Sequence, residues 1–257
     1  MNALALAFGL LTAVSVRRLP DTRASGVAML LAPLTTVPVL GLLLAANLVV
    51  ANARLPALVA AVLVVGGAAL YSRAMHLDGL ADTADGLSAT GDTDARLAAM
   101  KASDVGPSGV AVLVLMLLLQ VACVTSLVGT WPGTSLTAIA WVTSRLAIAW
   151  CCRPGVPAAT STGLGAMVAG SVPSVGLIVS TGTVLVLATL AAWASESAWW
   201  TGTVVVVAGL LGAAVLLHRC LHRFGGVTGD VLGADVESAL AAALLAAVLL
   251  SAWAGAA

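Results

Sequence analysis

The sequence predicts an all-α, polytopic membrane protein with about seven transmembrane helices and a short N-terminal interfacial or re-entrant helix. The 257 residues are 61% apolar and only 9% charged, whereas a soluble domain is about one quarter charged. The apolar residues form long segments and not the short alternating strands of a membrane barrel. The charged residues gather in alternate connections between these segments, as in proteins whose loops face two different aqueous compartments.

The N-terminal segment, Met1 to Val16, is apolar but short. A transmembrane helix needs about 20 residues, so we expect this segment to lie at the interface or to re-enter the membrane. Its basic residues, Arg17 and Arg18, follow the apolar stretch. In a cleaved signal peptide they would precede it.

Seven longer apolar segments follow, and each should be a helix because backbone polar groups in lipid must be satisfied within the chain. These segments cover residues 27–50, 57–73, 107–128, 134–151, 172–193, 199–218 and 236–256. Pro33 and Pro38 should kink the first of them. Without an internal repeat or a low-complexity linker, residues 1–257 are expected to form a single integral-membrane domain.

The basic residues predict the orientation, because cytoplasmic loops are enriched in Lys and Arg. Of eleven basic residues, only Arg54 lies in one set of alternate loops. The opposite set holds Arg17, Arg18, Arg23, Arg73, Arg96, Lys101, Arg145, Arg153, Arg219 and Arg223. Of eleven acidic residues, only Glu196 lies on the same side as Arg54. We therefore expect the acidic loops to face the cytoplasm. The net charge of zero gives no reason to expect nucleic-acid binding.

The densest group of carboxylates is the run His76-Leu77-Asp78-Gly79-Leu80-Ala81-Asp82-Thr83-Ala84-Asp85-Gly86-Leu87. On a helix, Asp78, Asp82 and Asp85 fall within roughly 60° of one another. Like charges so placed repel, and a divalent cation would relieve the repulsion. Oxygen ligands favour Mg²⁺ or Mn²⁺ over Zn²⁺. The alternative is a solvated acidic helix end. His76 could steer a carboxylate, donate to a phosphate, or simply cap the preceding span.

A second polar segment, residues 225–237, precedes the last apolar segment. Four of its first nine residues are glycine, which would let the backbone approach a ligand closely. If a helix begins near Gly229, Asp230 and Glu237 share one of its faces. The alternative is a glycine-rich turn with a helix cap.

A third polar segment runs from Lys101 to Gly109, where Pro107 is typical of the first turn of a helix. A helix N-terminus can hold an anion, and Lys101 could bind phosphate as a point charge. The alternative is an ordinary helix start with a snorkelling Lys.

Arg145 lies within an apolar segment, where an arginine is usually functional or paired. Together these motifs indicate Mg²⁺-dependent phosphoryl transfer at a membrane surface.

Four runs, in this order and spacing, resemble the cobalamin synthase family, which is adenosylcobinamide-GDP ribazoletransferase. They are Arg18-Leu19-Pro20, HLDGLADTADGL at 76–87, Gly163-Leu164-Gly165 and GGVTGDVLGA at 225–234. The resemblance implies that adenosylcobinamide-GDP is joined to α-ribazole or its 5′-phosphate, with release of GMP. It also implies Mg²⁺ as cofactor and a place in the bacterial cytoplasmic membrane. A homo-oligomer, or contact with other cobalamin-assembly enzymes, stays open.

On this resemblance, the hypothetical mechanism places Mg²⁺ on the substrate diphosphate. Its expected ligands are Asp78, Asp82, Asp85, Asp230 and Glu237. Asp82 or Asp85 would take the proton of the attacking hydroxyl. The remaining groups would contact phosphate through the backbone or a side chain: Gly226, Thr228, Gly229, Lys101, Arg145 and His76.

Two other functions stay open. Residues Asp82 to Ala89 satisfy the opening D-x-x-D-G-x-x-A of CDP-alcohol phosphotransferases, although Thr90 stands where Arg should follow. A cation-coupled transporter would place ionisable residues near the bilayer midplane. Only Arg145 and the two prolines of the first span favour it.

Overall fold

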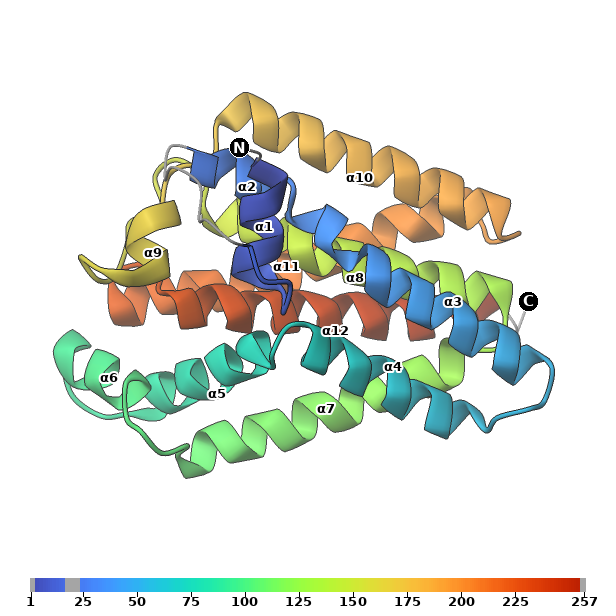
Figure 1. The fold of residues 1–257 in the computed structure, drawn as a ribbon, viewed down its shortest axis with the longest axis horizontal. Coiled ribbons are helices and arrows are strands. Elements are labelled where there is room, and N and C mark those ends of the chain that lie inside the picture. Colours follow the sequence, from blue (N-terminus) through green and yellow to red (C-terminus); the bar gives the residue numbers. More distant parts are fainter. Residues whose placement is uncertain (1–2, 17–23, 255–257) are drawn as a thin grey trace.

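A computed structural model describes residues 3–16 and 24–254, and within these ranges the regular secondary structure is helical apart from one isolated β-bridge. Figure 1 shows most of the long helices running along the longest axis of the molecule. The predicted all-α class is confirmed. The early motif Arg18-Leu19-Pro20 lies outside the described residues, as do Arg17 and Arg23.

Among the described residues, five helices are long and apolar enough to cross a membrane. The first is formed by η2 (Ala32–Thr36) and α3 (Val37–Ala51), and the others are α7 (Pro107–Leu127), α10 (Ser174–Ala194), α11 (Trp199–Phe224) and α12 (Gly229–Ala254). A sixth span results if α4 (Ala57–Tyr71) and α5 (Met75–Ser88), which meet at 85°, are counted together. The polar helix α5 is not one of the five.

The structure refines three of the predicted segments. The first is divided into α2 (Ser25–Leu30), η2 and α3, with Pro33 in the 3₁₀ turn and Pro38 in the first turn of α3. The α-helix is therefore interrupted at Pro33, whereas Pro38 lies at a helix start, where proline fits without a kink. The segment 134–151 becomes α8 (Trp131–Cys151), which is buried along most of its length. Its hydroxyl residues and Arg145 make α8 less apolar than the five spans. The last helix begins at Gly229, well before residue 236.

The N-terminal helix α1 (Ala3–Leu11) has 9 residues, so it is about 13 Å long and cannot cross a hydrocarbon core of about 30 Å. Its buried residues Leu6, Ala7 and Leu11 pack on the rest of the protein. The backbone N–H of Ala13 donates to the carbonyl of Tyr71 over 2.7 Å. This short helix is therefore anchored beside the end of α4.

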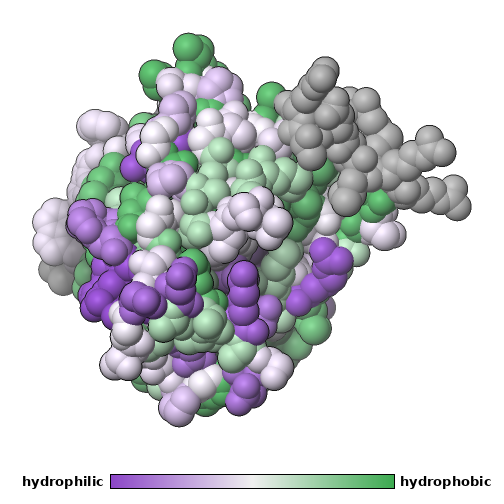
Figure 2. Space-filling model, turned by 90° about the vertical axis from the view of Figure 1, so that its left-hand side faces the viewer, coloured by the Kyte–Doolittle hydropathy of each residue, from purple (hydrophilic) through white to green (hydrophobic). Residues whose placement is uncertain are grey.

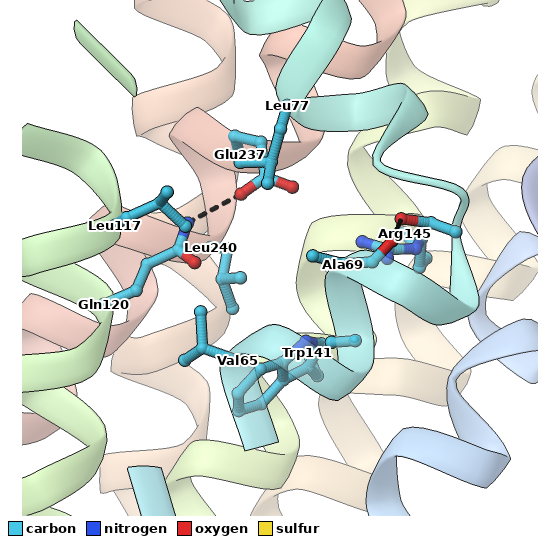
Figure 3. Close-up of a pocket in the computed structure, with 11 residues that line it drawn as sticks. Val65, Ala69, Leu77, Leu117, Gln120, Trp141, Arg145, Glu237 and Leu240 are labelled. Carbon is cyan, nitrogen blue, oxygen red and sulfur yellow. Dashed lines mark hydrogen bonds between the residues drawn. The ribbon is translucent and has the colours of Figure 1, made fainter. Parts of the chain in front are cut away.

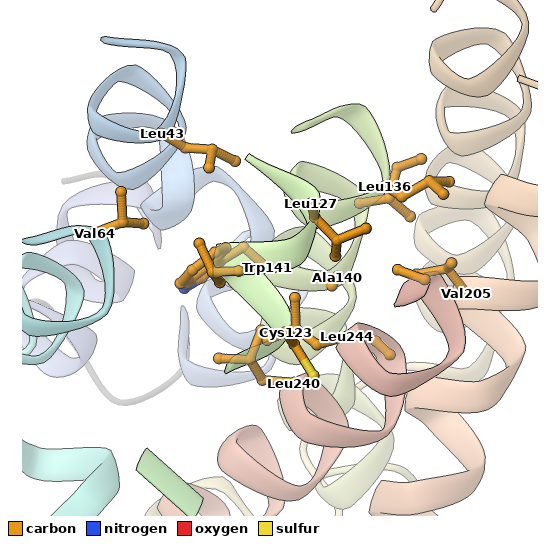
Figure 4. Close-up of a cluster of buried hydrophobic side chains, with 14 of the residues drawn as sticks. Leu43, Val64, Cys123, Leu127, Leu136, Ala140, Trp141, Val205, Leu240 and Leu244 are labelled. Atoms are coloured by element: carbon orange, nitrogen blue, oxygen red, sulfur yellow. The ribbon is translucent and has the colours of Figure 1, made fainter. Parts of the chain in front are cut away.

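The outward faces of the long helices are apolar. Leu115, Ile178 and Val215 expose 67%, 72% and 65% of their surface, on three different helices. Apolar surface of this extent favours lipid over water as its surroundings. The buried interior is built around α8 and α12, and Figure 4 shows Trp141 and Ala140 of α8 packed among leucines of α3, α7 and α12.

One end of the bundle is polar. Figure 2 shows hydrophilic side chains gathered on the end that lies at the left in Figure 1. This end carries α6 (Thr93–Met100) and α9 (Gly163–Val168), and the chain enters α7 and α12 there. The polar motifs of the sequence therefore meet at one end of the molecule.

Candidate functional site at the polar end

Helix α5 carries the three aspartates on one face, as their spacing predicts. Asp78 is exposed, and Asp82 and Asp85 are half-buried. The opposite face of α5, with Gly79, Leu80 and other residues, is buried against the bundle. The amphipathic pattern therefore turns the carboxylates outward while the apolar face holds the helix in place.

Two glycines bring α5 close to the start of α12. A Cβ atom added to Gly79 would lie 2.6 Å from the carbonyl oxygen of Asp230, and one added to Gly233 would lie 3.1 Å from the Cα of His76. Only residues without a side chain allow helices to approach this closely. As a result, Asp230 lies beside the carboxylates of α5, although it is far from them in sequence.

The carboxylates at this end act on one another. Burial, and then the charges of Asp78, Asp230 and Asp85, raise the pKa of Asp82 to about 6. Such a shift is the expected response of an acid to desolvation and to neighbouring negative charge. The ammonium group of Lys101 lies near enough to Asp230 to offset part of its charge. The group of Asp78, Asp82 and Asp230 therefore favours a bound cation.

The carboxylate oxygens at this end suit a hard cation, such as Mg²⁺, that keeps some of its coordinated water molecules. Within residues 3–16 and 24–254, no three His, Cys, Asp or Glu side chains are close enough to hold a metal ion by themselves. Mg²⁺ commonly binds through one or two carboxylates and takes its remaining ligands from water and phosphate. The solvent-accessible carboxylates of Asp78, Asp82 and Asp230 offer only oxygen ligands and are compatible with Mg²⁺ bound in this way.

Asp85 is engaged differently from Asp78 and Asp82. Its two carboxylate oxygens accept hydrogen bonds from the backbone N–H groups of Gly106 and Gly109, over 2.7 and 2.8 Å. Gly106 is the N-cap residue of α7, and Pro107 begins the helix as predicted. The anion held at this helix N-terminus is therefore a side chain of the protein itself.

The glycine-rich segment before α12 is clamped by two other parts of the chain. Val227 exchanges backbone hydrogen bonds of 2.9 and 3.0 Å with Pro157 and Ala159. Gly165 lies so close that an added Cβ would be 2.7 Å from the Cα of Thr228. The Gly163–Gly165 run and the later glycine-rich run, distant in sequence, thus pack directly together.

Thr228, Gly226 and Gly229, which were predicted from the sequence to bind phosphate, occupy different places in this segment. The Thr228 hydroxyl accepts from the Val231 N–H over 3.2 Å and donates to the Asp230 carboxylate over 3.3 Å, so Thr228 is the N-cap of α12. Gly226 is buried against Pro157 and Ala158. Gly229 begins α12, and a backbone N–H at the start of a helix can donate to an anion.

Three predicted site residues lie apart from the open carboxylates. His76 is 3% exposed, and neither ring nitrogen has a hydrogen-bond partner. Arg145 and Glu237 are 5% and 6% exposed and line a cavity inside the bundle. Glu237 accepts a hydrogen bond of 2.6 Å from Gln120 (Figure 3). The predicted set is therefore divided between an open group and a buried group.

Sequence reasoning missed two members of the buried group, Gln120 and Trp141. Gln120 is a single amide within the otherwise apolar run of α7, and that isolation could have identified it. Trp141 lies one turn before Arg145 on α8 and lines the same cavity. An indole in an apolar segment gives no comparable signal, because tryptophan is common at membrane interfaces.

Comparison with known proteins matches nearly the whole chain. The family described as cobalamin-5-phosphate synthase matches residues 3–248. An adenosylcobinamide-GDP ribazoletransferase of Nocardioides sp. is 43% identical over 95% of this chain and 97% of its own length. A protein of that name from Frankia casuarinae is 38% identical over 93% of this chain and 91% of its own length. One from Pseudomonas aeruginosa is 35% identical over 97% of this chain and 98% of its own length. No solved structure matches the chain.

Proposed function

The chain belongs to the cobalamin-5-phosphate synthase family of enzymes, which act at the final step of cobalamin assembly, and we propose that it joins adenosylcobinamide-GDP to α-ribazole or α-ribazole 5′-phosphate. The products are adenosylcobalamin or its 5′-phosphate, and GMP. We place the protein in the bacterial cytoplasmic membrane, with its polar end facing the cytoplasm where these charged substrates are dissolved.

One observation carries the proposal: the open carboxylates of Asp78, Asp82 and Asp230 converge from two helices at the polar end, beside Lys101. A diphosphate substrate brings negative charge to this place, so a cation has to accompany it. Asp78 and Asp230 would hold Mg²⁺ through their oxygens. When bound, Mg²⁺ would neutralise phosphoryl oxygens and the charge of the leaving GMP.

The chain's own residues would move the proton. A secondary ribose hydroxyl of α-ribazole, which is also free in the 5′-phosphate, attacks the phosphorus on the cobinamide side, a new O–P bond forms, and the bond to GMP breaks. Asp82 would accept the hydroxyl proton, because a carboxyl with a pKa of about 6 is largely ionised at neutral pH yet basic enough to act. Lys101 would face the phosphates as a point charge.

Asp85 has a positioning role in this scheme. Its hydrogen bonds to Gly106 and Gly109 fix the start of α7 against α5, and the segment that includes Lys101 leads directly into that start. Thr228 and Gly229 would present the first N–H groups of α12 to a phosphate. Each of these groups orients or binds, and none takes part in bond exchange.

The test is a direct assay of the full-length protein in detergent. Adenosylcobinamide-GDP, α-ribazole and Mg²⁺ are incubated with it, and corrin products and GMP are separated by chromatography. We expect equimolar cobalamin and GMP, with loss of both in EDTA and in Asp82→Asn. If folded wild-type protein gave no turnover with either form of ribazole, the proposed reaction would be wrong, and CDP-alcohol substrates would be assayed next.

A further inference from the structure

A polar cavity lies inside the bundle, next to the junction between α4 and α5. It is lined by Ala68, Ala69 and Ser72 at the end of α4, by Leu77 of α5, and by Gln120, Trp141, Arg145 and Glu237 of three other helices. Its volume is about 20 Å³. Figure 3 shows the Gln120–Glu237 hydrogen bond on one side of this space, with Arg145 and Trp141 on the other.

The polar groups around the cavity are incompletely satisfied by protein atoms. Arg145 donates to the Ser144 hydroxyl over 3.0 Å, which uses one of the five N–H groups of a guanidinium. The indole N–H of Trp141 is buried and has no partner. Glu237 accepts from Gln120, and a carboxylate can accept several hydrogen bonds. The cavity thus has donors on one side and acceptor capacity on the other.

The size and chemistry of this space select its occupant. A cavity of this volume accommodates about one water molecule, and a buried water typically makes about three hydrogen bonds to otherwise unsatisfied groups. A water here can accept from Trp141 and Arg145 and donate to Glu237. The cavity is too small for a substrate phosphate, and its opposite charges offset each other, so it offers no site for a metal ion.

We propose that this cavity holds a single bound water that bridges Arg145 and Glu237, and that the water-bridged charge pair positions the catalytic end of the protein. Glu237 follows Asp230 by seven residues and lies on nearly the same face of α12. Arg145 belongs to the buried central helix α8. The bridge therefore sets the rotation of α12 and with it the placement of Asp230 beside α5.

Neutralising either Arg145 or Glu237 alone should lower activity and stability more than neutralising both residues together. A single neutral substitution leaves an uncompensated charge inside the bundle, which is costly, whereas a neutral pair of similar volume leaves none. The expectation differs if Glu237 is a metal ligand or Arg145 binds phosphate. In that case the double variant would be no better than the worse single variant.

The experiment compares Arg145→Gln, Glu237→Gln and Arg145→Gln/Glu237→Gln as full-length, detergent-solubilised proteins. The activity readouts rest on the proposed function. We expect each single variant to lose kcat by roughly tenfold to a hundredfold, with the KM of adenosylcobinamide-GDP and the half-activating Mg²⁺ concentration near their wild-type values. The double variant should recover roughly tenfold over the worse single variant. A double variant at or below the worse single, or a raised Mg²⁺ requirement in Glu237→Gln, would overturn the proposal.

Three further measurements extend the test, and two of them, the unfolding cycle and a density map, do not depend on the assigned reaction. The thermal unfolding temperatures of the same four proteins form a double-variant cycle that needs no substrate, and a positive coupling is expected even if wild type is inactive on these substrates. Trp141→Phe removes the indole N–H donor together with part of the buried ring, and it should lower kcat severalfold while the protein stays folded. An experimental density map that places Arg145 and Glu237 in direct contact, with no water between them, would also contradict the proposal.

Discussion

The carboxylate of Asp85 and the backbone N–H of Gly109 are joined by a hydrogen bond of 2.8 Å. The second oxygen of the same carboxylate accepts from Gly106. Both glycines leave no room for a Cβ, since an added one would approach the Asp85 carboxylate to 2.5 Å. The side chain of Asp85 therefore links helix α5 directly to the start of α7.

Replacing Asp85 should affect stability more than replacing Asp78. Asp85→Ala removes two charge-assisted hydrogen bonds at a helix N-terminus and should lower the free energy of unfolding by about 1–3 kcal/mol. Asp78→Ala, on the exposed side of the same helix, is the matched control and should unfold like wild type. The two are compared by thermal unfolding in detergent without Mg²⁺. Equal unfolding temperatures would contradict the capping role.

The close approach of α5 and α12 depends on Gly79. An alanine there would place its Cβ 2.6 Å from the Asp230 carbonyl, so the helices must separate, at a typical cost of about 1–3 kcal/mol for an overpacked contact. We expect Gly79→Ala to lose most of its activity. Gly66→Ala in α4, where an added Cβ meets nothing within 4 Å, serves as control and should stay active. Full activity in Gly79→Ala would show that the spacing is not required.

Asp78 and Asp82 should respond differently to Mg²⁺. In Asp78→Asn, the loss of a ligand should raise the Mg²⁺ concentration needed for half-maximal rate, by roughly tenfold or more, while saturating Mg²⁺ restores much of kcat. In Asp82→Asn, saturating Mg²⁺ should not restore kcat, because the proton acceptor is missing, and a loss of about 10²–10⁴-fold is expected. Rate measurements over a Mg²⁺ series separate the two cases. Restoration of Asp82→Asn by Mg²⁺ would assign Asp82 to the metal instead.

The orientation can be tested with introduced cysteines. All four native cysteines are buried, so wild type should react little with a membrane-impermeant maleimide. Asp94→Cys, at the polar end, should be labelled only after the cells are permeabilised. Arg54→Cys, in the turn between α3 and α4, should be labelled in intact spheroplasts. The reverse pattern would place the polar end outside and exclude the proposed orientation.

The sequence by itself determined the features that depend on local periodicity. Apolar segments of spanning length indicated the helices, and prolines indicated the interruption at Pro33. The spacing of Asp78, Asp82 and Asp85 placed them on one face of a helix, and the start of α12 at Gly229 placed Asp230 and Glu237 on another. These inferences succeed because helix geometry fixes which residues share a face.

The tertiary structure alone decided which of these groups meet. It placed Asp230 beside α5, gave the carboxylate of Asp85 to the start of α7, and turned Glu237 toward Gln120 and the cavity with Arg145. It also made α8 a buried central helix. Sequence could not supply these facts, because lipid solvates every apolar face equally well. Contacts between helices therefore follow from close packing at glycines such as Gly79 and Gly233 and from the pairing of polar groups, both of which join residues far apart in the chain.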